Sequence, residues 1–193
     1  LTQASTCYVG KFSSEDVFVP FKSLLPMVDP NDLIIDGWDI SSMDIAAATR
    51  RACVLDLDLQ NKLKGYLMHL KPRPSIYDES FIAANQISRV DNIITGSKVQ
   101  QMEKIRGDLQ DFKTKTGVDK VVVIWTANTE SYTDLRKGTH DSEFNLRAAL
   151  ARNEPEISPS TIMALACIDE GIPFINGSPQ NTFVPGLVEA AIR

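Results

Sequence analysis

Short apolar runs alternate with segments of helical periodicity along this chain, and this alternation restricts its fold more than any other feature. The strongest run, Lys120–Trp125, is rich in β-branched residues and is predicted to be a strand. Residues 32–36 and 173–179 predict two more strands, the first buried on both faces of a parallel sheet. The pattern indicates an α/β chain with a Rossmann-like, doubly wound parallel sheet.

The longest helical pattern lies between Ile45 and Leu70, where apolar residues recur every three or four positions. It predicts one long amphipathic helix, with Ser41 as its cap and Asp44 in its first turn. Two prolines after Leu70 would stop it. The segment that follows, residues 81–86, is compatible with either a short strand or a tight extended turn.

Three further helices are expected in the second half of the chain. Periodicity between Met102 and Phe112 predicts one, closed by Gly117 in the left-handed conformation. Apolar residues between 144 and 149 predict another. Ser158 is suited to cap a third, with proline in its first helical position, and Gly171 would end it.

Composition excludes several classes of protein. The chain has 193 residues, 43% of them hydrophobic, and a formal net charge of −5, which is ordinary for a globular domain. It has no basic cluster that would bind nucleic acid and no apolar run long enough to cross a membrane. Its first residues do not resemble a signal peptide, so a cytoplasmic protein is expected.

The cysteines and histidines give no sign of a metal site or a nucleophile. Cys7, Cys53 and Cys167 are odd in number and far apart, so free and mostly buried thiols are expected. His69 falls near the end of the long predicted helix, and His140 lies in a polar segment. Both histidines are expected to be structural or exposed, with no metal bound.

Ligands of parallel sheets bind at the carboxyl ends of the strands, and three segments lie there: residues 37–39, 126–129 and 176–178. Asp39 can accept hydrogen bonds from ribose hydroxyls, or it can belong to an ordinary turn before a helix. Residues 126–129 are small and polar, which suits either a ligand or a turn. Gly177 would allow close approach of a dinucleotide, or it would serve a positive φ angle. No complete G-x-G-x-x-G is present.

Four stretches resemble the eukaryotic-type inositol-3-phosphate synthases, in the family's order and with similar spacing. They are Gly37–Ser41, Phe81–Gln86, Trp125–Glu130 and Asn176–Gly186. The last stretch is long and highly specific. The likeness extends over the whole chain, which begins at Leu1 and stops after an apolar, helix-like run, so an internal fragment is expected.

The resemblance implies an isomerase of inositol and phospholipid biosynthesis that is cytoplasmic and homotetrameric. It would cyclise D-glucose 6-phosphate to 1D-myo-inositol 3-phosphate, with NAD as cofactor, by internal oxidation, aldol closure and reduction. Carried over motif by motif, the family's NAD contacts fall on Asp39, Ser75, Ile76, Gln86, Arg89, Thr126, Ala127, Asn128, Thr129, Gly177 and Ser178.

Two regions of the family pattern fall outside the chain. The phosphate loop, with the first nucleotide-binding strand, would precede Leu1, and the lysine-rich catalytic region would follow Arg193. Residues 1–193 are therefore expected to form part of the NAD-binding domain, without a complete catalytic domain, and no catalytic residue is assigned. A non-catalytic short form that binds nucleotide or regulates full-length subunits is the alternative. The motif from Asn176 to Gly186 speaks against a third reading, an NAD-linked dehydrogenase.

Overall fold

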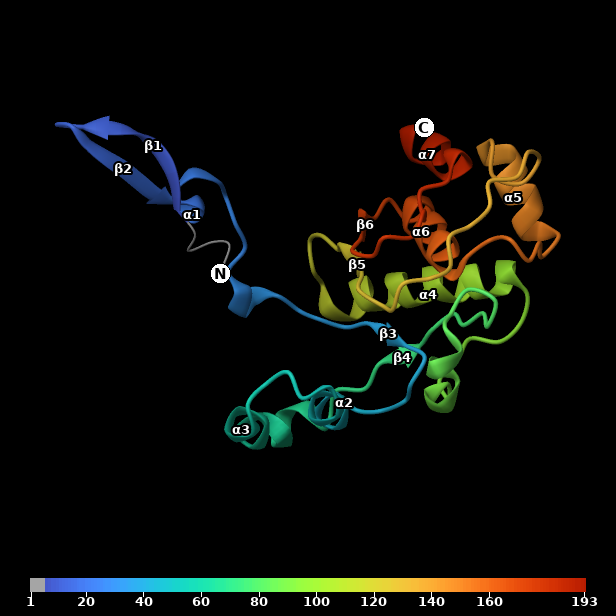
Figure 1. The fold of residues 1–193 in the computed structure, drawn as a ribbon, viewed down its shortest axis with the longest axis horizontal. Coiled ribbons are helices and arrows are strands. Elements are labelled where there is room, and N and C mark those ends of the chain that lie inside the picture. Colours follow the sequence, from blue (N-terminus) through green and yellow to red (C-terminus); the bar gives the residue numbers. More distant parts are fainter. Residues whose placement is uncertain (1–5) are drawn as a thin grey trace. The chain divides into compact units, whose positions relative to one another are not determined.

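The computed structural model describes residues 6–193, which divide into two compact units, one ending at Ile35 and one from Asp36 to Arg193 (Figure 1). The first unit contains an antiparallel hairpin of β1 (Thr6–Phe12) and β2 (Glu15–Pro20). A one-turn helix, α1 (Phe21–Leu24), and a 3-10 turn, η1 (Pro30–Asp32), follow. No pattern in the sequence predicted this hairpin.

The second unit contains two pairs of parallel strands. β3 (Trp38–Asp39) pairs with β4 (Arg73–Pro74), and β5 (Val123–Trp125) pairs with β6 (Phe174–Asn176). The pairs fit positions 3-2 and 4-5 of the doubly wound strand order 3-2-1-4-5-6. This arrangement confirms the α/β class and the parallel pairing expected from the sequence.

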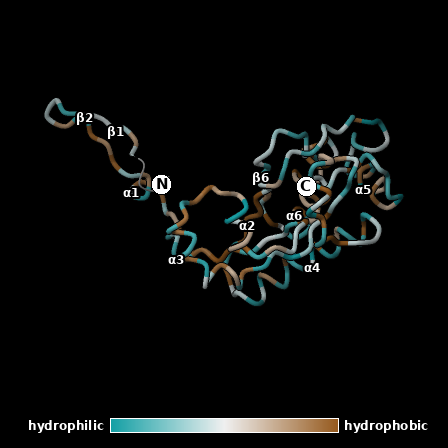
Figure 2. Tube along the Cα trace, turned by 60° about the horizontal axis from the view of Figure 1, so that its bottom comes forward, coloured by the Kyte–Doolittle hydropathy of each residue, from teal (hydrophilic) through white to brown (hydrophobic). Residues whose placement is uncertain are grey.

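Helices connect and cover these strands. They are α2 (Ile45–Ala52), α3 (Leu57–Leu67), the 3-10 helix η2 (Ala84–Arg89), α4 (Lys98–Thr116), α5 (Glu143–Ala151), α6 (Pro159–Asp169) and α7 (Pro185–Ile192). Helix α4 packs on α6, and α5 packs on α7, as Figure 1 shows. Helices α2 and α3 pack mainly on each other. Figure 2 shows hydrophobic and hydrophilic residues alternating along this helix pair.

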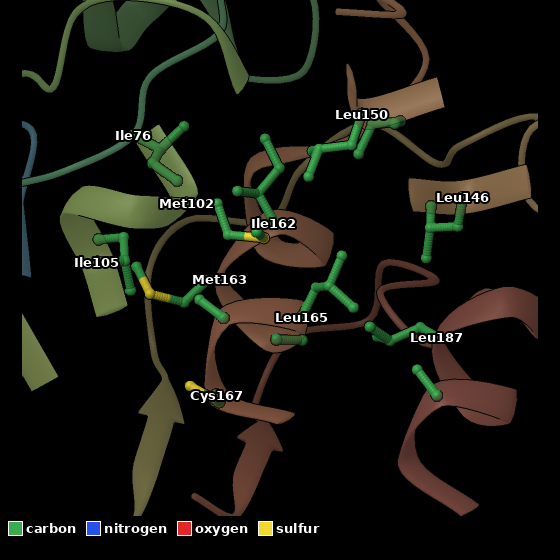
Figure 3. Close-up of a cluster of buried hydrophobic side chains, with 14 of the residues drawn as sticks. Ile76, Met102, Ile105, Leu146, Leu150, Ile162, Met163, Leu165, Cys167 and Leu187 are labelled. Carbon is green, nitrogen blue, oxygen red and sulfur yellow. The ribbon is translucent and has the colours of Figure 1, made fainter. Parts of the chain in front are cut away.

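The core of the second unit is built around α6, in which every residue from Pro159 to Cys167 is buried. In Figure 3, Met102 and Ile105 of α4 lie on one side of this helix, and Leu146 and Leu187 of α5 and α7 lie on the other. Because α6 contributes apolar atoms to several neighbours at once, its burial is the main hydrophobic contribution to the stability of this unit.

Several predicted elements are confirmed. Ser158 caps α6, with proline in the first turn, and Gly171 follows the helix with a φ of 64°. Gly117 is the left-handed C-cap of α4, with a φ of 66°. Helix α5 and strands β5 and β6 lie where periodicity placed them, and α7 occupies the apolar run near Arg193.

The long helix predicted between residues 45 and 70 is wrong as one element. It is broken at Cys53, which adopts a left-handed φ of 53° and ends α2. Asp56 then caps α3 by accepting a hydrogen bond from the Leu59 amide. Asp44, rather than the expected Ser41, caps α2. The side chains of Asp44 and Asp56 therefore decide where the two helices begin, and the left-handed backbone of Cys53 decides where α2 ends.

The strand predicted at residues 32–36 is also wrong, because no described strand pairs with this segment and Ile34 and Ile35 are exposed. The first strand of the second unit is β3, two residues further on. Residues 81–83 form a turn that leads into η2, and residues 84–86 belong to η2 itself, so the strand alternative is wrong and the turn alternative holds only for the first half of the segment. Within residues 6–193, no helix is both long and apolar enough to span a membrane.

One face of the β5–β6 pair packs on the core, and the other is uncovered by the described residues. Val123 is 8% exposed, whereas Ile124, which points the other way, is 57% exposed. Exposed apolar side chains on a strand with an unpaired edge favour association between copies.

We therefore expect the 193-residue chain to self-associate at micromolar concentration. Ile124→Lys should reduce association in analytical ultracentrifugation and leave the free energy of unfolding within about 0.5 kcal/mol of the parent. The matched control, Val123→Lys, should cost about 3 kcal/mol or more, because it buries an unpaired charge. A monodisperse parent chain with a single cooperative melt would contradict this expectation.

Candidate functional site

A cavity of about 460 Å³ lies between the two parallel pairs and is lined by residues 36–40 on one side and 121–125 on the other. It includes the carboxyl end of β5, where ligands of such sheets bind. Eight of the eleven expected cofactor contacts line it: Asp39, Ser75, Ile76, Gln86, Arg89, Thr126, Ala127 and Asn128. The structure thus brings together residues that are up to 89 positions apart in the sequence (128 minus 39).

The β3 side of the cavity is fixed by hydrogen bonds from loops. Asp39 Oδ1 accepts a hydrogen bond of 2.9 Å from the Ser41 amide, and the Asp39 carbonyl accepts one of 3.1 Å from Asn92. The amide and hydroxyl of Ser42 both donate to Asp91, and these bonds lower the pKa of that carboxyl. Asp39 is exposed, and no described residue donates to its Oδ2, so this atom can accept from a ligand.

Gln86 and Arg89 enter the cavity from η2. Gln86 Oε1 and Arg89 Nε are buried atoms without a hydrogen-bond partner among the described residues. Trp125 Nε1, another atom of a residue that lines this cavity, is in the same condition. The Trp125 side chain belongs to the core cluster, so only Gln86 Oε1 and Arg89 Nε count toward the cavity. Because an unsatisfied buried polar atom is costly, these two atoms suit a polar ligand.

Arg73 is a cavity residue that the sequence analysis missed. Its guanidinium contacts Asp36 at 2.7 Å, Asp108 at 3.2 Å and Asp111 at 3.0 Å, and Asp108 also accepts from the Trp38 indole at 3.0 Å. Burial alone would lower the pKa of Arg73, but the hydrogen bonds with these carboxylates outweigh it and raise the pKa. This network joins β3, β4 and α4. No sequence motif predicted the Arg73 network.

The β5 side of the cavity continues into the loop of residues 126–129, all of which are exposed. Thr129, Gly177 and Ser178 are not among the residues that line the cavity. Gly177 and Ser178 nevertheless contact the end of β5 and the loop that follows it. The Gly177 amide donates to the Trp125 carbonyl at 2.9 Å, and Ser178 Oγ donates to the Ala127 carbonyl at 3.0 Å.

Gly177 is required for a reason that neither sequence interpretation gave. Its φ is not positive, which rules out the conformational explanation. A Cβ at this position would lie 2.8 Å from the Trp125 carbonyl oxygen, closer than atoms can pack. Glycine therefore lets the β6 loop approach the end of β5.

Neither histidine, nor Cys53 or Cys167, is among the residues that line this cavity. His140 is buried, its Nδ1 accepts from the Arg136 amide at 3.0 Å, and its Nε2 lies 3.2 Å from the Glu156 carbonyl, so its role is structural as expected. All three cysteines are free, but only Cys167 is buried; Cys53 is exposed, contrary to expectation. Residues 6–193 contain no cluster of three or more side chains suited to a metal ion.

Glu130, directly after the 126–129 loop, is a buried acid that the sequence analysis did not assign. Its carboxylate accepts two hydrogen bonds from Ser160, 3.0 Å from the amide and 2.5 Å from the hydroxyl. Desolvation nevertheless raises the pKa of Glu130, because it outweighs these hydrogen bonds.

The raised pKa of Glu130 predicts a pH-dependent stability. Between the unfolded and folded pKa values, the folded chain retains a proton that the unfolded chain loses, so the free energy of unfolding falls as pH rises. As pH rises from the ordinary glutamate pKa toward neutrality, the wild-type free energy of unfolding minus that of Glu130→Gln should therefore decrease. Urea titrations of both proteins across this pH range measure the difference. The contributions of the other carboxylates cancel, because both proteins contain them. A constant difference would refute the assignment.

A cavity at the carboxyl ends of parallel strands, with this strand arrangement, places the chain in the class of Rossmann-like nucleotide-binding domains. A family model for an NAD-binding domain, described as myo-inositol-1-phosphate synthase, matches residues 1–193. The chain belongs to the myo-inositol-1-phosphate synthase family.

Known proteins support this membership. The chain is 55% identical to inositol-3-phosphate synthase 1 of Oryza sativa subsp. japonica and 58% identical to the inositol-3-phosphate synthase of Mesembryanthemum crystallinum, over all 193 residues. A crystal structure of the inositol-3-phosphate synthase from Caenorhabditis elegans matches 98% of the chain, with 47% identity and a TM-score of 0.95. The chain spans 38% of the length of each of these three proteins.

These findings confirm the family resemblance and the Rossmann-like α/β fold derived from the sequence. The NAD-binding domain model also agrees with the expected cofactor.

Proposed function

We propose that this chain is the NAD-binding portion of an inositol-3-phosphate synthase. The full-length protein would cyclise D-glucose 6-phosphate to 1D-myo-inositol 3-phosphate, an isomerisation that supplies inositol for phospholipids. The observation that carries the proposal is that eight residues expected to contact NAD line one cavity, although they come from four separate segments of the chain. By the same resemblance, the full-length protein would be cytoplasmic and homotetrameric, with its catalytic side chains outside residues 1–193.

The cavity residues fit a dinucleotide. Asp39 offers a free carboxylate oxygen for ribose hydroxyls, and Arg89 offers a guanidinium whose Nε has no described partner and can serve a phosphate. Gln86 Oε1 needs a donor, which a ribose hydroxyl or an amide can supply. Exposed residues 126–129 present backbone groups at the end of β5.

The chemistry that NAD supplies when bound is the removal and return of one hydride, so that the overall reaction has no net redox change. The residues of this chain hold the cofactor and exclude water from part of it. They include no assigned acid or base for the sugar.

NAD binding tests the proposed site. In the full-length protein that carries this chain, Asp39→Ala and Asn128→Ala should each weaken NAD binding about 10-fold in calorimetry, a loss of about 1.4 kcal/mol. Glu154→Ala changes a half-buried residue outside the cavity, so it is the control and should bind NAD as the parent does. Equal affinity in all four proteins would show that the residues are placed wrongly, and no binding by the parent would favour a non-catalytic role.

A turnover assay tests whether the catalytic side chains lie outside residues 1–193. The purified 193-residue chain should form no inositol phosphate from glucose 6-phosphate and NAD, because the catalytic side chains lie elsewhere. The full-length protein should form it under the same conditions. Product formed by the 193-residue chain would disprove the proposal that it lacks catalytic residues.

A further inference from the structure

The exposed loop of residues 126–129 is held by its neighbours rather than by its own backbone. In the described chain, none of its amides donates to another backbone group. Among residues 6–193, the one hydrogen bond that restrains it along its length runs from Ser178 Oγ to the Ala127 carbonyl. Such a loop has one conformation only if both of its ends are fixed. Its first end is fixed by Trp125, which lies in β5 and accepts from Gly177.

Its second end is fixed by Glu130, which is 4% exposed. The carboxylate of Glu130 reaches the first turn of α6, where it accepts from both the amide and the hydroxyl of Ser160. A negative charge is favoured at this position, because the free amides and the dipole of a helix point toward it. Since α6 is the most buried helix of the unit, Glu130 attaches the loop to the least mobile element.

The loop after β6 strengthens this attachment. Gln180 Oε1 accepts from the Glu130 amide at 3.4 Å, and Thr182 Oγ1 lies 2.8 Å from Ser160 Oγ. Asn181 both donates to and accepts from the backbone of Thr133, at 2.8 Å in each direction. Gln180 and Asn181 therefore contact the segment that follows the loop, and Thr182 contacts the first turn of α6.

We propose that Glu130 is a positioning residue: through Ser160 and Gln180 it fixes the conformation in which residues 126–129 meet NAD, an inference that rests on the proposed function. Burying a carboxylate costs desolvation free energy, so a buried carboxylate is tolerated only where both of its oxygens are hydrogen-bonded. Ser160 meets that requirement, because its amide donates to Oε1 and its hydroxyl donates to Oε2 of Glu130. The loop that precedes Glu130 is thereby limited to one placement.

The loop conformation can be measured without NAD. In the full-length protein without NAD, TROSY-detected 15N relaxation should give backbone order parameters of about 0.85 for Ala127, Asn128 and Thr129, and Glu130→Ala should lower them below about 0.6. The control Glu103→Ala removes an exposed carboxylate of α4 and should change none of them. If Glu130→Ala does not fold, Gln180→Ala removes one restraint and leaves the carboxylate intact; its effect should be smaller and in the same direction. Unchanged order parameters would overturn the proposal.

A double-mutant cycle on NAD affinity separates positioning from general stability. In the full-length protein, Glu130→Ala should weaken NAD binding at least 10-fold. Asn128→Ala should reduce NAD affinity much less in the Glu130→Ala background than in the parent, because the loop is already misplaced there. Independent, multiplicative losses would overturn the positioning role. If the parent protein does not bind NAD while Glu130→Ala still loosens the loop, the proposed function fails and the role of Glu130 in ordering the loop stands.

Discussion

The second unit depends on the burial of α6, and that burial imposes a demand on the loops around it. A helix surrounded by core side chains cannot leave its first amides to water. Ser158 caps the helix by accepting from the Thr161 amide, and Glu130 accepts from the Ser160 amide. The Thr161 hydroxyl donates to the carbonyl of Thr182. Segments from two strand-end loops thus complete the hydrogen bonding of one helix terminus, and the same bonds determine where those loops lie.

The other side of the cavity has an electrostatic anchor. Arg73 links β4 to Asp36 before β3 and to Asp108 on α4, and Trp38 donates to the same Asp108. Asp108 is buried, so its charge is tolerated because several donors surround it. The β3–β4 pair, with only two residues in each strand, has few ladder bonds of its own. Its place beside α4 therefore depends on these side chains more than on the sheet.

Elements with a strong period and a local stop were predictable from the sequence. Helix α6 has its serine cap, its proline and its glycine in order, and β5 is almost entirely β-branched. The break at Cys53 was not predictable, because the apolar stripe continues across it and a left-handed cysteine is uncommon. The hairpin of β1 and β2 escaped because its turn is Ser13–Ser14, both with positive φ, where Asn-Gly is the usual sequence.

The residues of the candidate site likewise fall into those that the sequence predicted and those that it did not. Strand-end position alone led to Asp39 and to the loop after β5, because parallel strands place their carboxyl ends at one edge. Gln86 and Arg89 came only from the family resemblance, since they lie on a 3-10 helix whose placement is a tertiary matter. Arg73 and Glu130 were missed altogether. Their partners are 37 and 30 residues away, at distances in sequence that no local pattern encodes.

The motif from Asn176 to Gly186 is long because its positions meet different physical demands. Gly177 must lack a side chain to approach the Trp125 carbonyl, and Gly186 must lack one because a Cβ would clash with the Ser142 carbonyl. Asn181 pairs with a neighbouring backbone. Steric, hydrogen-bonding and packing requirements thus succeed one another within eleven residues, counted from Asn176 to Gly186. A motif of this kind is specific to one fold because it matches one set of neighbours, even where its residues do not line the cavity.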